Sequence, residues 1–191
     1  MCATIIQSYT PEDLLEMSDG DFYELVDGHL VKRNLGAEAS AIAMQLGIEL
    51  GIFLRGRGTR WVFGEGTGFQ CFPDSPDKVR KPDVSVVDSR RLEHGTLPNG
   101  YLRLHPDLAV EVVSPNDLVY EIDEKVQEFL DADVPVVWVV NPQLKTVRVH
   151  RPDGTSVTLS GQDELVGEGF LEGFRCRVDQ LFAKPPRPNP A

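Results

Sequence analysis

Residues 108–115 read LAVEVVSP, a short apolar run with one carboxylate, Glu111, at its centre. In a strand, side chains alternate between the two faces, so Glu111 would share a face with Ala109 and Val113. Burying an ionised carboxylate among valines is costly unless a cation pairs with it. We therefore expect Glu111 either at a polar cleft where a buried strand ends or beside a cation, which we take to be a metal ion.

Two further acids occupy comparable positions. Asp83 directly precedes VSVV at residues 84–87, and it follows Pro82, which lacks a backbone donor and favours the first position of a strand. Glu24 lies in YELV, next to a predicted hairpin turn, although an isolated acid is more often a surface residue. Mg²⁺ prefers oxygen ligands and usually takes one or two carboxylates from a protein. The three acids therefore predict a hard-cation site at the margin of a sheet.

The bulk properties indicate one domain. A chain of 191 residues can bury a substantial core, so we expect a single domain over residues 1–183 and a proline-rich, disordered tail at 184–191. We see no secretory signal and no apolar run of membrane-spanning length, so no membrane association is expected. Three cysteines without C-x-x-C spacing argue against a disulfide framework or zinc site. These features predict a reduced, cytoplasmic protein.

The charge balance constrains the partners. A net charge of -11 argues against indiscriminate nucleic-acid binding, because a phosphate backbone attracts surplus Lys and Arg. Solvated surface residues and local nucleic-acid contacts are both compatible with the basic stretches that do occur. These stretches contain Arg55, Arg57 and Arg60, then Lys78, Arg80 and Lys81, and finally Arg90 and Arg91.

Local patterns predict alternating helices and strands. Thr10 before Pro11 is typical of a helix start, and Asp27-Gly28 is a favoured two-residue hairpin turn. Gly47 and Gly51 in the second helix indicate close approach to a neighbour. The predicted elements are a helix from 11 to about 17, a hairpin around 27–28, a helix over 37–54, a bulged strand over 61–72, strands at 84–87 and 136–140, an antiparallel ribbon in 146–160, and a final strand with a short helix. Residues 89–106 are irregular and are either a substrate-contacting loop or a plain connector.

A helix from about 116 to 132 follows the central strand. Its apolar face is predicted to contain Leu118, Ile122, Val126, Phe129 and Leu130, and its solvent face Glu121, Glu124, Glu128 and Asp131. Lys125 lies at the border of the buried arc. It either extends outward to solvent or reaches over the sheet end toward Glu111, and the pattern alone favours the outward position.

Asp83, Glu111 and Lys125 provide the groups that phosphodiester hydrolysis requires. A metal ion neutralises developing charge and acidifies a bound water, and a nearby cation orients that water. Asp83 and Glu111 would hold the metal, with the backbone carbonyl of Val112 as a further ligand. Lys125 would position the nucleophile, and Glu24 would bind the metal through water or hold a second ion.

The order of motifs resembles that of a known family. YELVDGHLV at 23–31, KPDVSVV at 81–87, PDLAVEVVSP at 106–115 and DVPVVWVVNP at 133–142, followed by VRVHR, resemble the Uma-type restriction endonucleases, a branch of the PD-(D/E)XK nuclease superfamily. The similarity runs from about Tyr9 to Phe182. It implies an α/β (α+β) fold with a restriction-endonuclease-like core, a mixed central β-sheet flanked by helices, and Mg²⁺-dependent DNA cleavage, with Mn²⁺ as a possible substitute.

The same resemblance assigns roles to single positions. Asp83 matches the superfamily's first acid, Glu111 its second, and Glu24 the acid that many members contribute near the N-terminus. The usual lysine lies two residues after the second acid, where this chain has Val113. Its role would then pass to Lys125. Ala39 stands where many relatives carry a histidine.

Rival interpretations remain. A nuclease-like fold without catalysis, used for binding or regulation, would suit the acidic surface and the absent second-strand lysine. A hydrolase of another phosphoester or of a sugar is a third possibility. Ser114 lacks a G-x-S-x-G elbow, and nothing indicates the aromatic groove that a glycosidase with Glu111 and Asp83 would need. A homodimer is possible through the strand at 136–140 or the ribbon after it, because cleaving both DNA strands is easier for a dimer.

Overall fold

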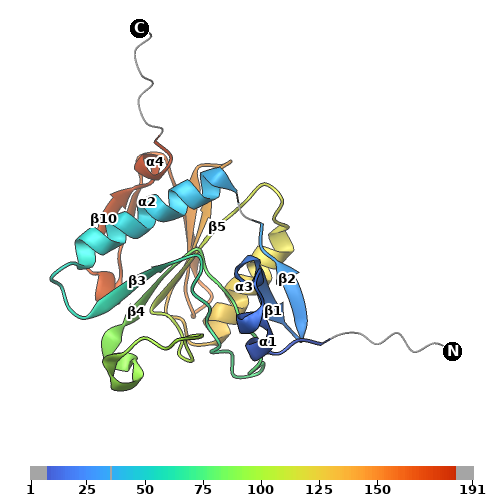
Figure 1. Cartoon of the computed structure of the whole chain (residues 1–191). Coiled ribbons are helices and arrows are strands. Elements are labelled where there is room, and N and C mark those ends of the chain that lie inside the picture. Colours follow the sequence, from blue (N-terminus) through green and yellow to red (C-terminus); the bar gives the residue numbers. More distant parts are fainter. Residues whose placement is uncertain (1–7, 35, 184–191) are drawn as a thin grey trace, which may run out of the picture.

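A six-stranded mixed sheet lies at the centre of the computed structural model, which describes residues 8–34 and 36–183 (Figure 1). The strand order is β3 (Arg60–Gly64), β4 (Val84–Asp88), β5 (Leu108–Val112), β6 (Val137–Asn141), β7 (Thr146–His150) and β8 (Ser156–Ser160). Only β5 and β6 pair in parallel, and the other neighbours are antiparallel. The predicted mixed sheet flanked by helices is confirmed. The tail at 184–191 lies outside the described residues.

The central strand β5 has the predicted alternation. All five of its residues are buried. Ala109 packs with Phe129 of the helix α3 (Val119–Asp131), whereas Leu108 and Val110 belong to the apolar cluster on the other face. Glu111 therefore points to the α3 side of the sheet, because it shares the face of Ala109. The parallel pairing of β5 with β6 follows from α3, because this helix returns the chain to the end of the sheet at which β5 begins.

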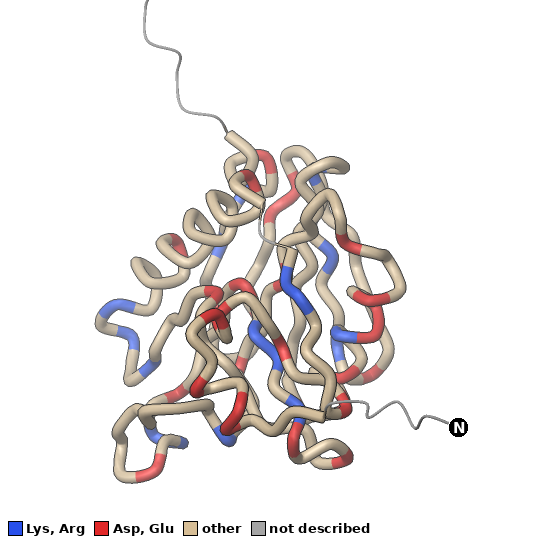
Figure 2. The backbone as a smooth tube through the Cα atoms, turned by 45° about the vertical axis from the view of Figure 1, so that its right-hand side comes forward, with Lys and Arg blue, Asp and Glu red and all other residues tan. Residues whose placement is uncertain are grey.

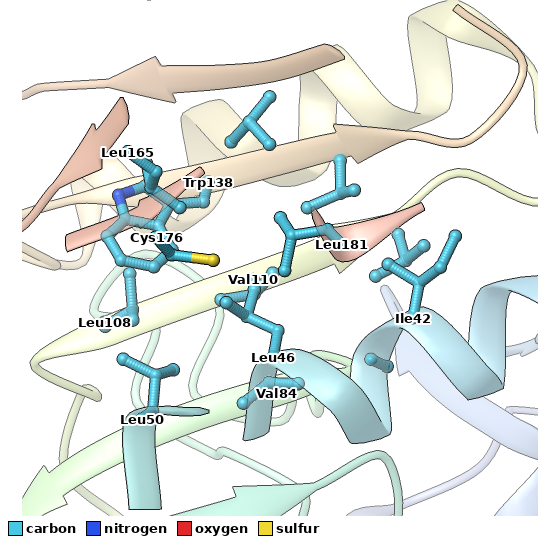
Figure 3. Close-up of a cluster of buried hydrophobic side chains, with 14 of the residues drawn as sticks. Ile42, Leu46, Leu50, Val84, Leu108, Val110, Trp138, Leu165, Cys176 and Leu181 are labelled. Atoms are coloured by element: carbon cyan, nitrogen blue, oxygen red, sulfur yellow. The ribbon is translucent and has the colours of Figure 1, made fainter. Parts of the chain in front are cut away.

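The helix α2 (Ala37–Leu54) covers the opposite face, over the bounds that the apolar spacing predicts. Figure 3 shows Ile42, Leu46 and Leu50 directed toward Val84, Val110 and Leu108 of the sheet. A Cβ at Gly47 would lie 3.9 Å from the Val84 side chain, which is an ordinary van der Waals contact, so the close approach expected at Gly47 is not observed. The same expectation is wrong for Gly51, where a Cβ would meet nothing within 4 Å.

The C-terminal part completes this core. Strands β9 (Glu164–Val166) and β10 (Arg175–Arg177) form a separate two-stranded sheet, followed by the short helix α4 (Val178–Leu181). Phe174, just before β10, stacks on Trp138 of β6 with ring centroids 6.0 Å apart. The predicted final strand and short helix are confirmed, but β9 is an additional element.

The expectation that the chain has no apolar run of membrane-spanning length is wrong for α2. This helix is long and apolar enough to cross a membrane by length and composition, with a mean hydropathy of 1.4 over 18 residues. The side chains of one of its faces pack on the sheet, which is also the arrangement of an ordinary core helix. That the protein does not associate with membranes stays a prediction.

A hairpin with its own small core lies beside α3. Strands β1 (Tyr23–Val26) and β2 (His29–Lys32) pair around Asp27 and Gly28, whose φ angles of 49° and 78° fit the predicted turn. The preceding helix α1 (Pro11–Glu16) begins after Thr10, as predicted, and Thr10 and Asp13 form a capping box there. A two-way backbone bridge between Leu25 and Val79 joins the hairpin to the segment that leads into β4.

Other expectations are wrong in specific ways. The strand predicted over 61–72 ends at Gly64, and only Phe69 makes further bridges. In the helix predicted from about 116, Leu118 is exposed because α3 begins only at Val119. Glu128 is half-buried because it pairs with basic side chains. The strand at 136–140 cannot pair with a second copy, since β6 is bonded on both sides. Among the described residues, β3 and β8 form the two edges of this sheet.

Candidate active site

Asp83 and Glu111 meet because they lie at neighbouring strand ends. The Asp83 backbone N–H donates to the Val110 carbonyl at 2.9 Å, which places Asp83 beside the C-terminal end of β5. Its Oδ2 accepts from the Val112 N–H at 2.7 Å. Both acids line one pocket of about 170 Å³, together with Val112. The three residues predicted to hold the metal therefore line the same pocket.

Lys125 reaches this pocket from α3. Its Nζ lies 2.8 Å from Glu111 Oε2 and 2.8 Å from Glu24 Oε1. The residue is only 9% exposed, so the expectation that it extends outward to solvent is wrong. Val126 and Phe129 of α3 pack on the sheet and fix the orientation of the helix. Lys125, at the border of the buried face, therefore points at the end of β5.

Glu24 is buried and bound on several sides, in contrast to the surface position that is common for an isolated acid. Beyond Lys125, its Oε1 accepts from the Lys81 N–H at 2.7 Å and its Oε2 from Arg80 Nη1 at 3.0 Å. The bridge between Leu25 and Val79 sets this register, because it aligns β1 with the residues that precede Asp83. The hairpin thereby delivers Glu24 to the site.

A second layer of charge supports Glu24. Arg80 Nε donates to Glu128 Oε2 at 2.6 Å, and Lys78 Nζ lies 2.5 Å from Glu128 Oε1. The charges alternate from Glu111 through Lys125, Glu24, Arg80 and Glu128 to Lys78. The sequence placed Glu128 in solvent and did not place Arg80 in the site. The signal available was the position of Arg80 three residues before Asp83.

Arg33 is the other residue that the sequence did not reveal. It follows β2, lines the pocket, and its Nη2 lies 3.3 Å from Asp83 Oδ1. Its Nη1 donates to the Glu65 carbonyl at 2.7 Å. No spacing rule connects Arg33 with Asp83, since the contact depends on how the hairpin docks against the sheet.

Burial and the surrounding charges move the pKa values of the site in opposite directions. Burial alone would raise the pKa of Glu24, but Lys125 and Arg80 lower it to about 2. Burial raises the pKa of Glu111 to about 8, against the opposing effect of Lys125 and with further contributions from Asp83 and Glu24. Burial also raises the pKa of Asp83. The pKa of Lys125 is raised despite burial, because Glu111 and Glu24 favour its charged form.

The donor set fits a divalent cation. Glu111 Oε1 is buried and has no hydrogen-bond partner within the described residues, so one oxygen of the site is unsatisfied. Six acidic and four basic residues line the pocket. This acidic excess attracts a cation and opposes a phosphate group. Within residues 8–34 and 36–183, no three Asp, Glu, His or Cys side chains converge on one point, so an ion would rely on two carboxylates, a backbone carbonyl and water.

Several predicted features lie outside the pocket. Residues 89–106 contribute nothing to its lining, because they connect the end of β4 with the start of β5, on the side of the sheet away from the pocket. Ala39 is buried at the start of α2. Ser114 donates its backbone N–H to Asp117 Oδ2 at 2.6 Å, which fits a strand terminator.

Most of the basic stretches are engaged in ion pairs. Lys78 and Arg80 pair with Glu128, and Arg90 pairs with Asp88. Figure 2 shows Lys and Arg interspersed with Asp and Glu over most of the chain. The loop between α2 and β3, with Arg55 and Arg57, lies at the Asp88 end of the sheet, opposite Asp83. These stretches therefore do not form a basic surface around the pocket.

Comparisons with known proteins agree with the fold and the motifs. The Uma2 family model, described as "Putative restriction endonuclease", matches residues 11–179. A crystal structure titled a putative nuclease belonging to DUF820, from Anabaena variabilis ATCC 29413, superposes with a TM-score of 0.77 at 22% sequence identity. The match covers 91% of this chain and 97% of that chain. No curated protein matches the chain.

Proposed function

Because the chain belongs to the Uma2 family of putative restriction endonucleases, we propose that it is a metal-dependent DNA endonuclease acting at the Asp83, Glu111 and Lys125 pocket. The observation that carries the proposal is the convergence of two strand-end carboxylates and one buried ammonium group. Catalytic phosphodiester hydrolysis needs such parts. The reaction would be hydrolysis of a DNA phosphodiester by water.

Asp83, Glu111 and the backbone carbonyl of Val112 would hold Mg²⁺ or Mn²⁺. When bound, the ion would neutralise charge on the phosphate and lower the pKa of a coordinated water. The support lies in the unsatisfied Glu111 Oε1 and the acidic excess of the pocket. Asp83 is held ready by the Val112 N–H, which fixes one carboxylate oxygen.

Lys125 would act as an ammonium ion. Glu24 and Glu111 keep it protonated, so it is suited to orient a water by hydrogen bonding and to stabilise negative charge. A protonated lysine is not a general base. Glu24 would be a positioning residue, because its other bonds to Arg80 and the Lys81 N–H hold it in place to orient Lys125.

The test is nicking of supercoiled plasmid with Mg²⁺ or Mn²⁺. We expect Asp83→Asn, Glu111→Gln and Lys125→Ala each to lose about 100-fold or more in rate, as removal of catalytic groups commonly does. Glu93→Gln is the matched control, because this glutamate side chain is 93% exposed and lies on the connector at the far end of the sheet. Undiminished cleavage in the three site variants would disprove the assignment.

A second candidate function is a non-catalytic binding or regulatory module. It is favoured by the pairing of most basic stretches with acids, which leaves no basic surface around the pocket within the described residues. Calorimetry separates the two functions. Saturable Mn²⁺ binding that disappears in Glu111→Gln supports the enzyme, whereas absence of binding in the unsubstituted protein supports the module.

Cleavage of both DNA strands would be served by a homodimer. Strand β8 is an edge of the sheet, composed of SVTLS, and could pair with a second copy. Light scattering on the purified chain tests this part of the proposal. A mass equal to one chain at all concentrations would contradict it.

A further inference from the structure

Arg33 is the buried cation of the pocket that the proposed function leaves without a role. Its backbone N–H donates to the Phe22 carbonyl at 2.8 Å, which extends the hairpin by one bond beyond β2. Its side chain is 7% exposed and lies among the pocket lining. Arg33 is therefore held in place by backbone pairing and burial.

The contacts of its guanidinium group are unequal. Nη1 donates to the Glu65 carbonyl at 2.7 Å, a short bond to an acceptor that cannot change its charge. Nη2 lies 3.3 Å from Asp83 Oδ1, whereas bonds between a guanidinium and a carboxylate are usually about 2.7–2.9 Å. Arg33 is thus anchored at Glu65 and held only loosely by Asp83.

Arg33 also has unused donors. A guanidinium carries five N–H groups, and within the described residues only these two bonds form. Two of the other three lining cations are more fully engaged. Arg80 donates to Glu24 and Glu128, and Lys125 lies between two carboxylates. Lys32, the fourth lining cation, is exposed to solvent. Arg33 is consequently the buried lining cation that, within the described residues, has capacity for an additional anion.

We propose that Arg33 binds the scissile phosphate of the substrate and that it exchanges Asp83 for a phosphate oxygen. The planar donors of an arginine match two phosphate oxygens. When Asp83 ligates a divalent ion, its Oδ1 becomes a weaker partner for Arg33, while the Glu65 carbonyl keeps the guanidinium in the pocket. This assignment rests on the proposed nuclease function and adds the residue that recognises the phosphate.

The test uses Arg33→Met and three measurements. Mn²⁺ affinity by calorimetry should rise about tenfold, because the variant frees Asp83 and removes one positive charge. Affinity for a short DNA duplex, with Ca²⁺ replacing Mn²⁺ to prevent turnover, should fall about tenfold or more. Plasmid cleavage should fall about 100-fold. The opposite directions of the first two effects identify a residue that competes with the metal and binds the substrate.

Arg60→Met is the matched control. Arg60 is also a partly buried arginine, and its Nη2 lies 3.4 Å from Asp88 Oδ2 at the opposite end of β4. This control should leave Mn²⁺ affinity within about twofold of the unsubstituted protein. Arg33→Lys keeps the charge without the planar donors, so it should keep Mn²⁺ affinity and still lose DNA affinity. This second variant is informative if Arg33→Met does not fold.

Two results would overturn the assignment. If Arg33 only positioned Asp83, Arg33→Met would weaken Mn²⁺ binding, and unchanged DNA affinity in Arg33→Lys would show that the planar donors are not used. Failure of the nuclease function looks different. In that case, the unsubstituted protein neither binds Mn²⁺ nor cleaves DNA. If only the Arg33 assignment fails, the unsubstituted protein does both, and the Arg33 variants depart from the expected affinities.

Discussion

Lys125 is the residue whose loss the site would tolerate least. It is the partner of both Glu111 and Glu24, each at 2.8 Å, in a buried environment. Lys125→Met would leave two carboxylates without their shared cation, and breaking a buried pair in this way costs about 3–5 kcal/mol. Urea denaturation measures the loss. The exposed Lys145→Met should change the free energy of unfolding by less than about 0.5 kcal/mol, and an equal effect of both variants would contradict the prediction.

Glu111 should make stability fall with rising pH. Its pKa is raised from 4.5 to about 8, so the folded protein holds a proton that the unfolded chain releases. Its contribution to stability is complete below 4.5 and is lost as pH rises through about 8. Glu111→Gln removes this dependence. Relative to the unsubstituted protein, the variant should become progressively more stable as pH rises from about 5 to about 9, measured by urea denaturation.

Glu24 gives the opposite sign and is the control for that experiment. Its pKa is lowered from 4.5 to about 2, so its contribution is present above 4.5 and is lost as pH falls through about 2. Glu24→Gln should therefore be destabilised at neutral pH and approach the unsubstituted protein in acid. Parallel pH profiles for the two variants would show that Lys125 and Arg80 do not separate the pKa values of the two carboxylates.

At the same scale, the sequence identified the acids better than the cations. Asp83 and Glu111 were recognisable because each interrupts or begins an apolar strand, and strand alternation is a local property. The orientation of Lys125 depends on how α3 packs, and that of Arg33 on how the hairpin docks. Neither is encoded in spacing along the chain. Glu24 was recognised as a third acid beside a predicted strand, but its burial became evident only from Arg80 and Lys125.

Among the elements, α2 offers a direct test of how the core is built. Leu46 is fully buried against the sheet, and Met44 on the same helix is 65% exposed. Leu46→Ala should lower the free energy of unfolding by about 2–5 kcal/mol, because it removes buried contacts and leaves a cavity. Met44→Ala should cost less than about 0.5 kcal/mol. Similar losses in thermal or urea denaturation would mean that α2 is not seated as described.

The predictions of secondary structure were wrong where a strand depends on pairing with a segment distant in the sequence. The helix over 37–54 was correct because its apolar period repeats over five turns. The strand over 61–72 ends at Gly64, and the chain turns through Gly66 before Phe69 bridges to Arg80 and Leu102. β9 has three residues and is stabilised by β10, so it has no pattern of its own. Long periodic segments were predictable, and short paired ones were not.

For the whole molecule, charge determines how DNA would be bound. The chain carries a net charge of -11, and the pocket has more acidic than basic lining residues. We expect affinity for a DNA duplex to rise about tenfold or more when Ca²⁺ replaces EDTA, because a bound cation reverses the local charge. Fluorescence anisotropy measures this change. The double variant Asp83→Asn, Glu111→Gln should lose the gain, and equal affinity in EDTA and Ca²⁺ would contradict the prediction.

The attachment of the β1–β2 hairpin has a consequence for thermal inactivation. The hairpin is a sheet of its own, with a backbone bridge at Leu25 and Val79 and a small apolar cluster separate from the main core. Units of this kind can open without global unfolding. Opening would move Glu24 and Arg33 out of the site together, so nuclease activity would be lost while the six-stranded sheet remained folded. Amide protons of residues 23–33 should then exchange with solvent deuterium earlier than those of β5 and β6, and the enzyme would regain activity on cooling.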